Sequence, residues 1–309
     1  MDQHKKTITE LEPGPARFEY ILDRLGEGFA LCRSLGLRPE QGRFSQYRDV
    51  VERLLDIATS DPENFTHRTQ DARYRVAVTE SLELADMLPY LVSCSPGTLK
   101  PKLRLVLDGP EMPSDETPAS NEARNIQLEL RLASLLSQAG FSPNLGEKPD
   151  LWLDRPWTFL FECKRVFSYR RIRDRIWEAG QTLREARKNH VASAEGIIAI
   201  SLSRLLIDDD DRAIPIPNSI AGKASLGAWV ERVQGAFDDI VRRVFEKSLT
   251  IAVFFYVASD FANRTTSGVD RGFSIYVHAD RPPFAPYGRA LDELKQGFHA
   301  LEKLYSPRA

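Results

Sequence analysis

The spacing of apolar residues changes part of the way along this chain, and this change constrains the fold more than any other feature. Between residues 18 and 93 the apolar residues recur three or four positions apart, as at Ile21, Leu22 and Leu25, which predicts packed helices. After residue 120, short apolar runs alternate with segments of helical spacing. This alternation predicts an α/β fold in which a mixed sheet is covered by helices on both faces.

The predicted elements after residue 120 follow a definite order. A helix over 121–139, ended by Gly140, precedes two strands at 151–154 and 157–164. The link Arg155-Pro156 is so short that these strands should form a hairpin. The remaining predictions are a charged helix at 170–190, a buried strand at 196–202, a helix at 226–244, strands at 249–257 and 273–277, and a final helix at 291–304.

The stretch from Ser95 to Ser120 is rich in proline and interrupts the pattern, so we interpret it as a connector or a domain boundary. A chain of 309 residues exceeds the size at which one hydrophobic core usually stops growing. We therefore expect an all-helical N-terminal region at 1–110, a linker at 111–119 and an α/β domain at 120–309.

Charge and cysteine content limit the functional classes to which the chain can belong. Lys and Arg total 42 against 44 for Asp and Glu, so the net charge of −2 excludes a polycation and restricts any nucleic-acid site to a local patch. The three cysteines form no CxxC pair, which argues against a disulfide framework and favours a reducing compartment, the cytoplasm. The longest apolar run, at 249–258, is too short for a membrane-spanning helix, and no signal-peptide pattern opens the chain, so we expect no membrane association.

Ionisable residues end the second predicted strand of the hairpin. Alternation along 157–164 places Glu162 and Lys164 on the same face. Asp150 opens the preceding strand, so its carboxylate can lie beside that of Glu162. Charge at the end of an apolar strand is costly unless it is paired or used.

A third carboxylate, Glu129, should face the same region, because its neighbours one helical turn away are Ile126 and Ala133. Two like charges about 5 Å apart repel by roughly 3 kcal/mol at an effective dielectric near 20, so such a cluster calls for a cation. Oxygen ligands without His or Cys select Mg²⁺, with Mn²⁺ as a substitute. A metal there could polarise a phosphate and activate a water, and Lys164 could orient or deprotonate that water.

The residues Glu129, Pro149-Asp150 and Glu162-Cys163-Lys164 resemble the motif of the PD-(D/E)xK nuclease superfamily, which includes many restriction endonucleases. The order of elements over about 120–205 is similar too, and Gln181 stands on the helix where many members carry a Gln. Position 185 is Glu, where the RecB-type branch has Tyr. The resemblance implies a restriction-endonuclease-like fold and a Mg²⁺-dependent endodeoxyribonuclease, a phosphodiester hydrolase.

Under this interpretation Asp150, Glu162 and Glu129 bind the metal, Lys164 positions the water, and Gln181 contributes to the catalytic set. Structural alternatives stay open for each position. Asp150, Glu162 and Lys164 could form an ordinary salt bridge on a surface hairpin. Glu129 could pair with an arginine such as Arg124, and Gln181 could be a solvated helix residue.

Arginines follow the motif closely and could bind phosphate, because guanidinium groups match phosphate oxygens. The predicted contacts are Arg165, Arg170, Arg171, Arg173 and Arg175, the alternative being a solvated helix face. The expected substrate is DNA, with RNA as an alternative. The run Asp208 to Asp211 is interpreted as a solvated loop and not as a metal site.

Two other functional classes compete with the nuclease. One is a catalytically silent nuclease-fold module that binds nucleic acid or a protein partner without cutting. The other is a regulatory or assembly protein that works through its N-terminal helices. A second copy of the chain or an accessory protein could dock on those helices or on the C-terminal helix.

Overall fold

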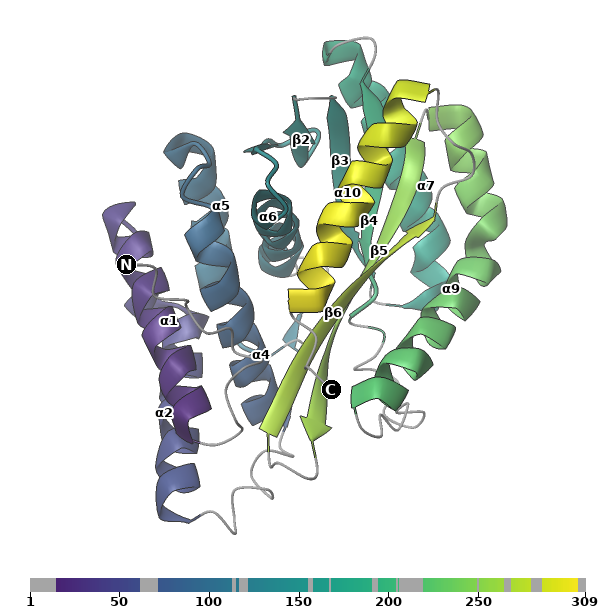
Figure 1. Ribbon diagram of the computed structural model, residues 1–309. Helices are drawn as coiled ribbons and strands as arrows, with labels where there is room; N and C mark the ends of the chain where they lie inside the picture. The colour runs from purple at the N-terminus through teal and green to yellow at the C-terminus, as the bar shows by residue number, and fades with distance from the viewer. Residues whose placement is uncertain are drawn as a thin grey trace.

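A computed structural model provides the three-dimensional structure, which is drawn in Figure 1. It describes residues 15–61, 72–112, 115–116, 122–154, 158–166, 168–190, 194–203, 205, 219–248, 250–263, 268–278 and 285–304. Arg155-Pro156, Trp157 and the run Asp208 to Asp211 lie outside these residues.

The chain begins with a layer of helices, as the apolar spacing predicts (Figure 1). Their buried faces carry the predicted residues, among them Ile21, Leu25 and Leu54. The elements are α1 (Pro15–Ser34), η2 (Pro39–Gln41), α2 (Arg43–Ser60), α4 (Ala72–Met87), η3 (Leu88–Tyr90) and α5 (Pro96–Asp108).

A mixed sheet of six strands follows in the order β1-β2-β3-β4-β5-β6. The first three strands are antiparallel, β3, β4 and β5 are parallel, and β6 returns antiparallel to β5. The strands are β1 (Pro143–Leu145), β2 (Leu151–Leu153), β3 (Phe159–Arg165), β4 (Glu195–Ser201), β5 (Thr250–Asn263) and β6 (Gly268–His278). The prediction of an α/β fold with a mixed sheet between helices is therefore confirmed.

Helices cover both faces of the sheet. On one face, α7 (Tyr169–Asn189) and α9 (Ser219–Ser248) pack over Leu160 of β3 and Ile198 and Ile200 of β4. On the other face, α10 (Ala285–Leu304) lies over the sheet (Figure 1). Its Phe298 contacts Phe254 of β5. Because side chains alternate along β3, Glu162 and Lys164 share the face of Leu160.

The helix α6 (Glu122–Gln138) lies between the N-terminal helices and the sheet (Figure 1). Its residues from Gln127 to Leu136 are all buried, which is typical of a helix packed on every side. One hydrophobic cluster runs from α1, α2, α4 and α5 through α6 to β3, β5 and α10. The predicted helix at 121–139 is confirmed, and Gly140 ends it with a positive φ of 88°.

The structure corrects the interpretation of 95–120 as a connector throughout. Residues 96–108 form α5, which starts at Pro96, and a proline in the first turn of a helix loses no hydrogen bond. The short strand β1 is a further element that the sequence pattern did not predict. Among the helices of the described residues, none has the length and apolar character needed to cross a membrane.

Candidate functional site

The hairpin of β2 and β3 brings Asp150 and Glu162 together. Leu151 pairs with Phe161, so Asp150, which directly precedes β2, stands at the level of Glu162. The pairing covers only Phe159 to Phe161 of β3, and residues 162–165 of β3 lie beyond the end of β2. The acidic residues therefore lie where the two strands separate.

The Asp150 side chain binds a backbone group of β3 beyond the end of β2. Its Oδ2 accepts a hydrogen bond of 2.6 Å from the backbone N–H of Cys163. The side chain is only 9% exposed, and no described residue donates to its other oxygen, Oδ1. One oxygen of Asp150 is thus fixed by the backbone, while the other is free to take a ligand.

Glu162 and Lys164 point into the same space, as the alternation predicts. The Lys164 Nζ donates to Glu162 Oε1. The other oxygen, Glu162 Oε2, is buried and has no hydrogen-bond partner, and the whole residue is 4% exposed. A buried carboxylate oxygen without a donor is costly, so a cation or a proton bound at Glu162 Oε2 would stabilise the fold.

Glu129 joins the group from α6 and pairs with a residue that the sequence analysis missed. The Lys102 Nζ, from α5, donates to Glu129 Oε2. The alternative pairing with Arg124 is wrong, because Arg124 binds Glu80 and Glu116 instead. The helical spacing of Leu99, Leu103 and Val106 was the available signal for a helix that could carry Lys102, and the surrounding prolines obscured it.

The charge of Asp150 acts on both glutamates of the group. Burial raises the pKa of Glu129 to about 8, the negative charge of Asp150 adds to the rise, and Lys102 opposes it. Burial and Asp150 likewise raise the pKa of Glu162 to about 7. Burial raises the pKa of Asp150 itself, against the Cys163 N–H and Lys164.

For Lys164, the neighbouring charges outweigh the effect of burial on the pKa. Burial alone would lower the pKa of its ammonium group, but Glu162 and then Asp150 outweigh that effect and raise it. The group is therefore held as a cation. A protonated lysine can orient a water or stabilise a phosphate, but it is a poor base in this state.

The acids form a loose cluster and not a closed cage. Within the residues that the structure describes, no group of three or more His, Cys, Asp or Glu side chains is arranged to hold a metal ion. Two ammonium groups, Lys102 and Lys164, offset part of the negative charge of the three acids. Among the described residues, no donor binds Asp150 Oδ1, Glu129 Oε1 or Glu162 Oε2, so one oxygen of each acid is left for a cation.

Gln181 lies half-buried on α7, the helix that covers the face of Glu162 and Lys164. Among the described residues, no hydrogen bond joins its amide to the three acids. Its catalytic role stays a prediction.

The predicted arginines are in different environments. Arg171 pairs with Asp174 at 3.4 Å and Arg175 with Glu178 at 2.7 Å, each within one turn of α7, as on a solvated helix face. Arg173 pairs with Asp239 of α9, and Arg170 is exposed without an ion pair to any described residue. Arg170 and Arg173 also line a hollow between α7 and α9.

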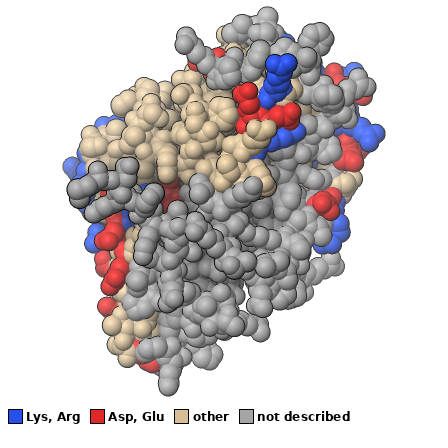
Figure 2. All heavy atoms as spheres, viewed as in Figure 1, with Lys and Arg blue, Asp and Glu red and all other residues tan. Residues whose placement is uncertain are grey.

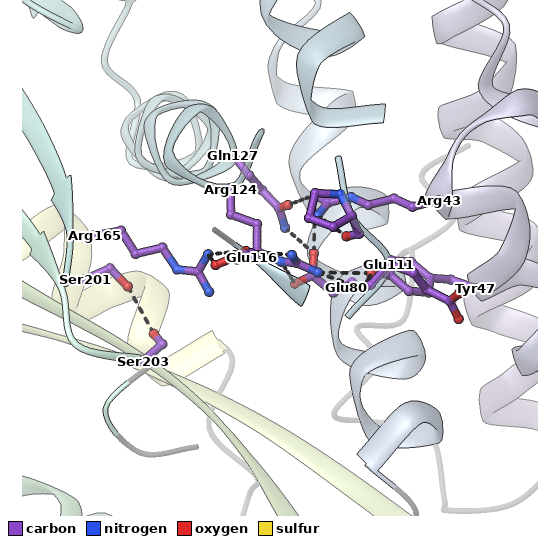
Figure 3. Close-up of polar contacts among 11 residues, drawn as sticks. Arg43, Tyr47, Glu80, Glu111, Glu116, Arg124, Gln127, Arg165, Ser201 and Ser203 are labelled. Carbon is purple, nitrogen blue, oxygen red and sulfur yellow. Dashed lines mark hydrogen bonds and ion pairs between the residues drawn. The ribbon is translucent and has the colours of Figure 1, made fainter. Parts of the chain in front are cut away.

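Arg165 belongs to a buried polar network. Its Nη1 binds Glu116 Oε1 at 2.9 Å, and Arg124 binds the same carboxylate at 2.6 Å (Figure 3). The Arg165 side chain is 10% exposed, so its guanidinium is committed to the interior. The same network continues through Glu80 to Arg43 and Gln127 (Figure 3).

The face drawn in Figure 2 has no broad patch of one charge among its described residues. Its Lys and Arg side chains lie among Asp and Glu side chains, mainly near the edges of the view. On this face, the described residues therefore form no extended cationic surface.

Comparisons of the chain with models of protein families, with curated proteins and with solved structures found no match.

Proposed function

We propose that this chain is a metal-dependent nuclease that hydrolyses phosphodiester bonds of DNA with Mg²⁺. The observation that carries the proposal is the buried, partnerless Glu162 Oε2 beside Asp150 and Glu129, in a cluster where each acid has a raised pKa. A divalent cation would satisfy that oxygen and remove the repulsion. Structural ion-pair networks also shift pKa values, so the proposal depends on the orphaned oxygen as well as on the pKa shifts.

The residues fit magnesium better than softer metals. All candidate ligand atoms are carboxylate oxygens, which Mg²⁺ prefers. Magnesium commonly takes one or two protein carboxylates and completes its shell with water and substrate phosphate, so a closed cage of three acids is not required. Asp150 Oδ1 and Glu162 Oε2 would hold the ion, and Glu129 would support it from α6.

When bound, the ion would supply Lewis-acid polarisation of a phosphate and a more acidic water. The protein would contribute positions and charges. The Cys163 N–H fixes the orientation of Asp150. Lys164, held as a cation, would orient the attacking water or stabilise negative charge on the phosphate oxygens as it builds up.

Cleavage assays test this proposal. Purified protein is incubated with plasmid and with single-stranded DNA in Mg²⁺, Mn²⁺ or EDTA. We expect cleavage with either metal, none in EDTA, and a loss of roughly 10²-fold or more in Glu162→Gln and Lys164→Met. Glu178→Gln, on the exposed side of α7, is the matched control and should cleave normally.

Binding of the metal can be measured separately from cleavage. Mg²⁺ should raise the melting temperature of the wild-type protein, because it binds the folded chain better than the unfolded one. Asp150→Asn should remove most of this rise, while Asp154→Asn should keep it. Absence of both cleavage and a metal-dependent shift would refute the proposal.

One specific observation favours a second candidate, a nuclease-fold module that binds nucleic acid or a partner without cutting. Lys102 and Lys164 already offset part of the charge of the three acids, so the cluster can persist without a metal. This candidate predicts that DNA is bound but stays uncut in Mg²⁺ and in Mn²⁺.

A further inference from the structure

A hollow lies between α7 and α9, and its lining includes none of the three acids of the carboxylate cluster. Its lining consists of three arginines, two aspartates, one tryptophan and one isoleucine: Arg170, Arg173, Asp174, Trp177, Asp239, Ile240 and Arg243. The cavity has a volume of about 370 Å³, which lies at the lower end of the range for small-ligand sites.

The charged residues of the hollow differ in whether they already have an ion-pair partner. Asp239 is neutralised by Arg173, and Asp174 by Arg171. Neither Arg170 nor Arg243 forms an ion pair with a described residue. The hollow therefore presents two guanidinium groups without a carboxylate partner among the described residues, one from each helix, while its acids are paired. Such a pair selects an anion, and guanidinium groups match phosphate oxygens in particular.

The second feature of the hollow is a stacking surface. The Arg243 guanidinium lies 4.8 Å from the centre of the Trp177 ring, in a cation–π arrangement. Trp177 is half-buried against the core of α7 and α9, so its ring is held in place. Indole rings and guanidinium planes are the flat surfaces on which proteins stack unpaired bases.

We propose that this hollow binds a nucleotide of a single-stranded DNA segment, with its phosphate on Arg170 and Arg243 and its base stacked at Trp177. A strand is favoured over a duplex because the faces of paired bases are hidden in the stack. The inference rests on the proposed nuclease function and narrows its substrate to DNA with an unpaired segment. The helix α7 begins four residues after the end of β3, which carries Glu162 and Lys164, so we expect a strand held in the hollow to reach the carboxylate cluster as well.

Binding is measured in EDTA, so that metal-dependent cleavage cannot interfere. The probes are a fluorescein-labelled dT12 strand, the corresponding duplex, and a 12-residue abasic strand that has the phosphates without the bases. We expect the dT12 strand to bind most tightly. The double variant Arg170→Ala/Arg243→Ala should weaken that binding by about tenfold or more.

Two further readouts distinguish this site from general charge attraction. Removal of two phosphate contacts should reduce the slope of log Kd against log salt by about 1.4, since each contact contributes about 0.7 for a single strand. Tryptophan fluorescence should be quenched by dT12, and Trp177→Phe should lose that quenching. Arg184→Ala, on an exposed position farther along α7, is the matched control and should bind like the wild type.

The proposal is overturned if the abasic strand or the duplex binds as tightly as dT12, or if the double variant binds like Arg184→Ala. Equal binding of a phosphorylated peptide would also overturn it. The two proposals can fail separately. If only the nuclease proposal fails, the wild type and Glu162→Gln both bind dT12 and neither cleaves it.

Discussion

A buried carboxylate requires a positive charge or a proton, and the cluster of Glu129, Asp150 and Glu162 shows both solutions. Lys102 and Lys164 each form an ion pair with one glutamate. Burial raises the pKa values of all three acids, and the charge of Asp150 raises those of Glu129 and Glu162 further. The importance of each contact can therefore be measured one residue at a time.

Lys102 has the clearest expected effect on stability. In Lys102→Met, Glu129 stays buried without its ammonium partner, so the free energy of unfolding should fall by about 3 kcal/mol at pH 8.5, where Glu129 would otherwise ionise. The loss should be smaller at pH 6, where Glu129 is protonated. Urea unfolding at both pH values measures the difference. Arg104→Met, at an exposed position on the same helix, is the control.

The acids also predict how stability depends on pH without metal. The pKa values of Glu129 and Glu162, about 8 and about 7, lie above the ordinary value of 4.5. A group with a raised pKa in the folded chain stabilises it below the unfolded pKa, and this contribution is lost as the pH rises through the folded pKa. Stability should therefore fall between about pH 5 and pH 8.

Thermal unfolding across this range, with and without millimolar Mg²⁺, checks the prediction. Mg²⁺ should restore stability mainly at the alkaline end, because it binds the ionised carboxylates. A profile that does not change with pH would show that these carboxyl groups have ordinary pKa values in solution.

At the scale of elements, a buried ion-pair network joins α6 to α2 and α4 (Figure 3). Glu80 of α4 accepts from Arg124 Nε and Gln127 Nε2, each at 3.0 Å, and lies 3.6 Å from Arg43 Nη2. Burial alone would raise the pKa of Glu80, but Arg43 and Arg124 outweigh it and hold the pKa at about 2. The carboxylate therefore stays charged in the interior.

Glu80→Gln should lower the free energy of unfolding at pH 7 by about 3 kcal/mol, because it leaves buried guanidinium groups without their counter-charge. A lowered pKa stabilises the fold above the unfolded value of 4.5, and that contribution is lost as the pH falls toward 2. The difference in the free energy of unfolding between wild type and variant should therefore become smaller as the pH falls. Glu52→Gln, on the exposed side of α2, serves as the control in denaturant titrations.

Elements with a strong apolar period could be predicted from the sequence. The helices α6, α7, α9 and α10 and the strands β2 to β6 all overlap predicted segments. However, α9, α10 and β6 begin five to seven residues earlier than predicted, and β5 ends six residues later. The helix α5 was missed because prolines at 96 and 101 suggested a connector, although Pro96 stands at the helix start. The strand β1 is only three residues long, too short for a periodic signal.

The candidate site was predicted only in part, for a physical reason. Alternation and hairpin pairing are local rules, so they placed Asp150, Glu162 and Lys164 together. The pairing of Lys102 with Glu129 depends on how two helices pack, and no local period encodes that contact. The burial of Arg165 has the same origin, because Glu116 approaches it from a distant part of the sequence.

At the scale of the whole molecule, α6 is buried on all sides over Gln127 to Leu136. Leu128, Leu130 and Leu136 belong to a hydrophobic cluster that also includes Leu25 of α1 and Phe161 of β3. The N-terminal helices and one face of the sheet therefore share a core. The predicted boundary at 111–119 separates these parts in the sequence, but the cluster extends across it.

This shared core predicts the behaviour of a fragment. Residues 111–309 without the N-terminal helices would expose one side of α6, and buried leucines in water cost about 1.5–3 kcal/mol each. We expect the fragment to aggregate or to unfold without a cooperative transition, whereas the full chain unfolds cooperatively. Size-exclusion chromatography and circular dichroism distinguish these outcomes, and a monomeric fragment with an unchanged melting temperature would contradict the expectation.

The contact between Lys102 and Glu129 links the carboxylate cluster to the N-terminal helices. The ammonium group belongs to α5, while the acids belong to α6 and to the hairpin. A binding partner that drew α5 aside would withdraw one positive charge from the acids and leave every strand in register. A molecule that binds only the N-terminal helices would therefore change the charge at the carboxylate cluster without contacting the substrate.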